Sequence, residues 1–86
     1  MMRALFVGGT VDNSELDLEG NDPPRHYPPE TGAGISRYRL HHVGVRKETV
    51  IYAVYAAPDS ADEDILRIAD ERDYARRFEA DPQRVD

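Results

Sequence analysis

The stretch SRYRLHHVGVRKETVIYAVYA, residues 36 to 56, decides the fold of this 86-residue chain. Its first part, residues 36–43, alternates in polarity with a period of two, which is typical of a half-buried β-strand. Residues 49–56 are apolar on both faces and rich in β-branched and aromatic side chains, which indicates a central strand. Gly44 and the polar residues after it mark a reversal, so we expect the two strands to form a hairpin.

The alternation gives the first of these strands two distinct faces. One face carries Arg37, Arg39 and His41, and the opposite face carries Tyr38, Leu40 and His42. If a helix covers the face of Tyr38 and Leu40, the face with the two arginines meets solvent or a partner. Adjacent histidines on a regular strand point to opposite faces, so His41 and His42 are not expected to bind one metal ion.

The N-terminal part of the chain predicts another hairpin. Residues 3–7 form a short β-prone run that ends at two glycines, and residues 15–19 alternate charged and apolar side chains. Residues 20–35 follow as a proline-rich loop, because prolines lack the backbone donors that a sheet requires.

The C-terminal part predicts a helix over about residues 61–79. Ser60 and Glu63 have the spacing of a capping box, and acidic residues in the first turn suit the helix dipole. Tyr74 and Phe78 leave the apolar face of this helix, so it either bends there or ends near Arg72, with Asp73 capping a shorter second helix. The tail, residues 82–86, is expected to be frayed.

Together these segments predict an α+β fold in a single small domain, residues 1–86. Two hairpins form an antiparallel sheet of about four strands, and the C-terminal helix packs on one face of that sheet.

Composition limits the function of the chain. Cysteine is absent, which excludes disulfides and thiolate sites. The net charge is −6, and residues 58–86 carry ten of the seventeen acids against five bases. Such a field disfavours direct binding to nucleic acid, whose affinity comes largely from cations at phosphates. No apolar run is long enough for a membrane span, so we expect a soluble, cytoplasmic protein.

Several short motifs resemble a loose class of small uncharacterised phage and prophage proteins. They are the opening Phe6-Val7-Gly8-Gly9-Thr10-Val11-Asp12, the strand segments Tyr38-Arg39-Leu40 and Val54-Tyr55, and the closing acidic helix. The opening of that class usually reads Gly-Gly-Pro-Leu-Asp-Gly, whereas this chain has Thr10 at the proline position and Asn13 at the position of the last glycine. The resemblance implies a phage or mobile-element origin and carries over no catalytic residue.

Catalytic and cofactor motifs are weak in this sequence. Gly8-Gly9 lacks the Lys-Ser or Lys-Thr of a phosphate loop, and Gly32-Ala33-Gly34 precedes a strand instead of opening a helix. His26 and Glu30 are the one acid-base pair placed in a surface loop. We therefore expect no enzyme, no cofactor and no metal, and we keep a small ligand-binding protein or enzyme as the last alternative.

Three surfaces are candidates for binding another protein, and one of them is the strand face with Arg37, Arg39 and His41. In the proline-rich loop, Arg25, His26 and Tyr27 form either a stiff interface or a connector with the tyrosine packed on the sheet. On the helix, the acidic side chains include Asp62, Glu63 and Asp70, which suit a partner with a basic groove. The complete candidate interface is Arg25, His26, Tyr27, Arg37, Arg39, His41, Asp62, Glu63 and Asp70. The expected partner is a host or phage protein, and a homodimer through the sheet is the structural alternative.

Overall fold

The computed structural model describes residues 2–8, 14–27, 38–58 and 60–85. Its elements, in chain order, are β1 Met2–Val7, β2 Glu15–Leu18, β3 His26–Tyr27, β4 Tyr38–Arg46, β5 Thr49–Ala56, α1 Asp62–Glu71, α2 Tyr74–Arg77 and β6 Asp81–Arg84. The α+β class is confirmed. The prediction of about four strands and one helix matches only in part, because within these described residues the sheet has six strands and the helical segment is divided.

The sheet joins the two predicted hairpins through a parallel pair. Its strand order is β2-β1-β5-β4-β3, and β6 also pairs with β4. Both β1–β2 and β4–β5 are antiparallel, whereas β1 and β5 run parallel, with Arg3 opposite Tyr52. The sheet is therefore mixed. The position of β5 between two neighbours explains why its sequence is apolar on both faces.

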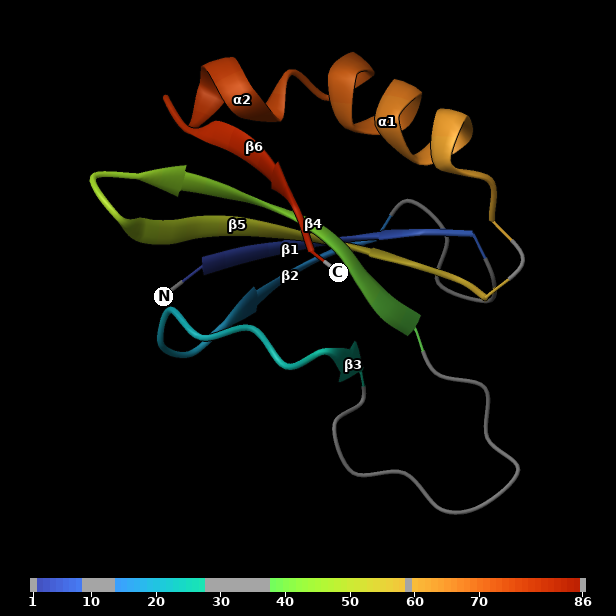
Figure 1. The fold of residues 1–86 in the computed structure, drawn as a ribbon, viewed down its shortest axis with the longest axis horizontal. Coiled ribbons are helices and arrows are strands. Elements are labelled where there is room, and N and C mark those ends of the chain that lie inside the picture. Colours follow the sequence, from blue (N-terminus) through green and yellow to red (C-terminus); the bar gives the residue numbers. More distant parts are fainter. Residues whose placement is uncertain (1, 9–13, 28–37, 59, 86) are drawn as a thin grey trace.

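The two helices lie over one face of this curled sheet, with β6 beside α2 (Figure 1). Under them lies a cluster that includes Leu5, Val54, Ile65 and Ala69. Asp73 has φ 58°, in the left-handed region, and this residue separates α1 from α2. The break turns two aromatic rings towards Tyr52, whose ring centroid lies 5.2 Å from that of Tyr74 and 5.8 Å from that of Phe78.

The opposite face of the sheet buries a second cluster. Phe6 lies at its centre, with ring centroids 5.3 Å from Tyr27, 5.2 Å from Tyr38 and 5.4 Å from Tyr55. The Tyr55 hydroxyl donates to the Pro24 carbonyl at 2.7 Å, which fastens the proline-bearing segment over this face. Burial of the Tyr55 hydroxyl raises the pKa of this side chain.

Two short strands occur where we predicted none. Residues 26 and 27, inside the expected loop, form β3 and pair with β4. The expected frayed tail forms β6, which pairs with β4 from His42–Arg84 to Val45–Asp81. Pro82 is tolerated because β6 is an edge strand bonded on one side to β4.

The start of α1 also differs from the prediction. Ala61 precedes the helix without a side-chain cap, and the Ser60 hydroxyl donates instead to the Val7 carbonyl at 3.4 Å. The predicted capping box is therefore wrong. Ser60 ties the helix start to the end of β1, because this short connection brings its side chain over the sheet.

Candidate functional site

A β-bulge in β4 places two histidines on the helix-covered side of the sheet. Leu40 lies opposite Tyr55 and His42 lies opposite Val54, so His41 is an additional residue between these pairs. Such an insertion breaks strict alternation and turns consecutive side chains to the same side. His41 and His42 are only 1% and 2% exposed, and their Nδ1 atoms are 2.7 Å apart. The expectation that they point to opposite faces is wrong.

A hydrogen bond connects the histidine pair to the first turn of α1. The Nε2 atom of His41 lies 3.0 Å from Oδ1 of Asp62, and Nη2 of Arg84 lies 3.5 Å from the other carboxylate oxygen. An ionised carboxylate only accepts hydrogen bonds, so His41 carries its proton on Nε2. Its Nδ1 then accepts from the Nδ1–H of His42. This tautomer leaves Nε2 of His42 as an acceptor.

The pKa shifts agree with this protonation pattern. Burial lowers the pKa of His42 from 6.5 to about 4, with the nearby charges of His41 and Arg84 adding to the effect. Burial also lowers the pKa of His41, against the opposing effect of Asp62. The hydrogen bond with His41, together with Arg84, lowers the pKa of Asp62. Both rings are therefore neutral at pH 7 and Asp62 is ionised.

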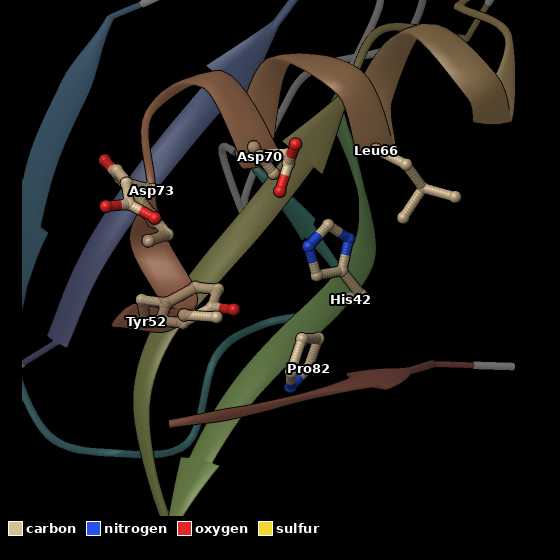
Figure 2. Close-up of a pocket in the computed structure, with 9 residues that line it drawn as sticks. His42, Tyr52, Leu66, Asp70, Asp73 and Pro82 are labelled. Carbon is tan, nitrogen blue, oxygen red and sulfur yellow. The ribbon is translucent and has the colours of Figure 1, made fainter. Parts of the chain in front are cut away.

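His42 forms part of a pocket of about 210 Å³ between α1, β4, β5 and β6. Its walls include His42, Tyr52, Leu66, Asp70, Asp73 and Pro82. In Figure 2, the Asp70 carboxylate lies above the His42 ring, and the Tyr52 hydroxyl points into the same space. Burial raises the pKa of Tyr52, with Asp81 adding to the shift, so this hydroxyl remains protonated.

Gly44 makes this arrangement possible. A Cβ atom at this position would lie 2.0 Å from Cε2 of Tyr52, which no real pair of carbons tolerates. The Tyr52 ring therefore rests directly on the β4 backbone. Since Tyr52 lines the pocket, this close approach fixes one of its walls.

A second ionic cluster lies at the other edge of the sheet. Arg3 contacts Glu15 at 3.0 Å and Asp17 at 2.6 Å, and Arg72 of the helical layer also pairs with Glu15. The Tyr74 hydroxyl contributes most to lowering the pKa of Glu15, although its geometry falls short of a hydrogen bond. This cluster fastens β2 and the helix to the sheet.

The predicted interface residues of the proline-rich loop differ in their exposure to solvent. Arg25 and His26 are exposed, and Tyr27 is half-buried against Phe6 and Tyr55. The Arg25 carbonyl accepts from the Leu40 amide at 2.8 Å. This segment is thus part of the sheet, and Tyr27 packs as a connector residue would.

The predicted arginine face does not look out from the sheet. The helices cover the side of His41, whereas Tyr38 and Leu40 belong to the opposite cluster. Arg39 is half-buried, and its charge is felt by His41 and Asp62. Arg37 lies outside the described residues.

The acidic residues of α1 have different environments. Asp62 is bonded to His41 and Arg84, so it has a structural role. Glu63 and Asp70 are exposed, and within the described ranges neither forms an ion pair. Between them lies Leu66, which is 45% exposed.

The pocket itself was missed by sequence reasoning. Tyr52, Leu66, Asp73 and Pro82 were each interpreted as elements of strand, helix or tail. Only the bulge and the pairing of β6 with β4 bring them to His42, and neither has a strong local signal. The nearest hint was Gly44, since an isolated glycine within a strand pattern marks a close approach.

No protein-family model, curated protein or solved structure matches this chain. Among residues 2–8, 14–27, 38–58 and 60–85, no three His, Asp or Glu side chains are grouped as a metal site would require. None of the helices in these ranges is both long and apolar enough to span a membrane.

Proposed function

We propose that this chain is a non-enzymatic protein-binding module that uses the exposed face of α1. The observation that carries the proposal is the combination of exposed Leu66 with Glu63 and Asp70, one turn away on either side. An apolar side chain surrounded by charged groups has the pattern of an interface anchor with a polar rim.

Charge supports a basic partner for this face. The first turn of α1 carries three acids, and its last turn carries no base. Asp62 and Asp64 pair with Arg84 and Arg67, whereas Glu63 forms no ion pair within the described ranges. Carboxylates without an internal cation remain available to Arg or Lys of another protein and accelerate encounter with it. The resemblance to small phage and prophage proteins motivates the concrete form of the proposal: an inhibitor of a host defence complex, such as a CRISPR effector, in the bacterial cytoplasm.

The test is affinity capture from a bacterial lysate, compared between the original chain and matched variants. Asp62 is unsuitable for charge reversal, because its ion pairs hold the histidine pair. The variant Glu63→Lys/Asp70→Lys changes exposed acids that lack such contacts. Glu19→Lys/Glu48→Lys makes the same charge change at exposed positions away from α1.

We expect the α1 variant to lose its partner and the control variant to retain it. Mass spectrometry identifies the captured protein, and circular dichroism checks that both variants are folded. Equal capture by both variants would show that the acidic helix face is not the interface.

The alternative is a structural or accessory protein that oligomerises through its sheet. One observation favours it: β2 is a sheet edge, and Leu16 on this strand is 43% exposed. An open edge can pair with a second copy. Light scattering at micromolar concentration separates the two functions, because the proposed module is a monomer and the alternative is at least a dimer.

A further inference from the structure

We infer that the pocket beside α1 binds a guanidinium group, supplied by an arginine side chain of the partner protein. The inference rests on the proposed function for the source of the arginine. The chemistry of the pocket stands independently of that source.

Two buried side chains present polar atoms to this pocket. Tyr52 is 1% exposed and His42 is 2% exposed. Nδ1 of His42 is occupied by His41, but within the described part of the chain no hydrogen bond is formed by its Nε2 or by the Tyr52 hydroxyl. Both point into the space below Asp70 (Figure 2). Among the described residues, the Tyr74 hydroxyl is the fully buried side-chain atom without a partner, so the two polar atoms of His42 and Tyr52 are accessible from the pocket and available to a ligand.

The three groups together define the charge of the ligand. The bonds from Asp62 through His41 leave Nε2 of His42 as an acceptor. The Asp70 carboxylate accepts as well, and the Tyr52 hydroxyl oxygen can do so. No Lys or Arg is among the residues that line the pocket. A ligand with several donors and a positive charge fits this set, whereas an anion would meet repulsion.

The shape of the pocket favours guanidinium over ammonium. Its volume of about 210 Å³ lies below the roughly 300–1,000 Å³ of sites for drug-sized ligands, and suits one side chain. Leu66 and Pro82 provide apolar walls for an aliphatic stem. A guanidinium has five donors in a plane and is more weakly hydrated than an ammonium, so it loses less on entering a partly apolar site.

The surrounding charges leave the pocket open to such a ligand. Asp73, at the rim, lies 3.7 Å from Nη1 of Arg76, whose side chain is 86% exposed. A contact of this length at an exposed site is weak and is readily exchanged. Arg84 is held by Asp62 outside the pocket lining. The location of Leu66 in both the pocket and the α1 face joins this site to the proposed interface.

The test is an NMR titration of the folded chain with blocked arginine, N-acetyl-arginine methylamide. We expect a dissociation constant of about 1 mM for a ligand of this size, with shifts at His42, Tyr52 and Asp70. Blocked citrulline has the same shape without the charge, and blocked lysine replaces the guanidinium. Both should bind at least about tenfold more weakly, since they lose charge or the planar donors.

Variants locate the binding. Asp70→Asn and Tyr52→Phe should each weaken binding by about five- to tenfold. Neither group has a hydrogen-bond partner within the described residues, so both variants should unfold at nearly the original temperature. Glu71→Gln, the neighbouring acid outside the pocket lining, should leave binding unchanged.

Three results would overturn the inference: equal binding of citrulline, equal binding of lysine, or an equal loss with Glu71→Gln. Free arginine distinguishes a protein side chain from the free amino acid as the source of the guanidinium. The carboxylate of free arginine would be repelled by the acidic residues at the rim of the pocket. Tighter binding of free arginine than of the blocked form would contradict a protein side chain as the ligand. Equal capture by the α1 variant and its control, with intact arginine binding by the original chain, would reject the proposed interface but not the pocket.

Discussion

Acid should destabilise this chain well above the pH at which its carboxylates are protonated. The buried His42 ring has a pKa of about 4, against 6.5 for an exposed histidine. The unfolded chain binds this proton more readily, so stability is complete above pH 6.5 and is lost as the pH falls towards 4. Between pH 7 and pH 5 the linkage relation gives a loss of about 2 kcal/mol from His42 alone.

The pH range of this loss distinguishes the contribution of His42 to stability from the contributions of the acids. Glu15 and Asp62 have pKa values lowered from 4.5 and 3.8, so their contributions are lost only at lower pH. The assay is urea unfolding at pH 7, 6 and 5 and constant ionic strength. His26→Gln, at an exposed position, should show the same loss, and His42→Gln a smaller one.

NMR titration of the His42 ring keeps the prediction testable if His42→Gln does not fold. The ring should remain neutral down to about pH 5. A ring that titrates near 6.5, or a free energy of unfolding that is constant from pH 7 to pH 5, would refute the reasoning from burial.

Three further predictions concern stability and share one assay, urea unfolding at pH 7. Gly44→Ala should lower the free energy of unfolding by about 1–3 kcal/mol, because the added Cβ collides with the Tyr52 ring. An unchanged midpoint of the urea unfolding curve would contradict this close packing. Ile65→Ala should lower the free energy of unfolding by about 2–4 kcal/mol and Leu66→Ala by less than about 1 kcal/mol, because Ile65 is fully buried and Leu66 is 45% exposed. Similar losses for the two variants would mean that the buried and exposed faces of α1 are assigned wrongly. Glu48→Gly should stabilise the chain by up to about 1 kcal/mol, because Glu48 has φ 66° in the β4–β5 turn; a loss of stability would show that its side chain contributes more than this strain.

The hairpins and the fold class could be predicted from sequence because their signals are local. The period of two in residues 36–43 and the doubly apolar residues 49–56 each reflect the side-chain pattern of one strand. The parallel pairing of β1 with β5 could not be predicted in this way. It depends on how two hairpins meet, and the sequences of both remain the same in either arrangement.

The candidate site was harder to predict than the fold. A single inserted residue at His41 reverses the expected side of His42, and simple alternation contains no signal for it. The last strand was missed because Pro82 resembles a strand breaker, yet the edge position of β6 tolerates it. On the acidic helix, sequence found Glu63 and Asp70 correctly as exposed, but it could not show that Asp62 is bonded to His41.

Photocrosslinking inside bacterial cells tests the proposed use of the α1 face most directly. A photoreactive residue is introduced by Leu66→p-benzoylphenylalanine, and a control carries the same residue in place of exposed Glu19. We predict a covalent product with one cellular protein from position 66 and none from position 19. A product from position 19 with none from position 66 would contradict the assignment of α1 as the binding face.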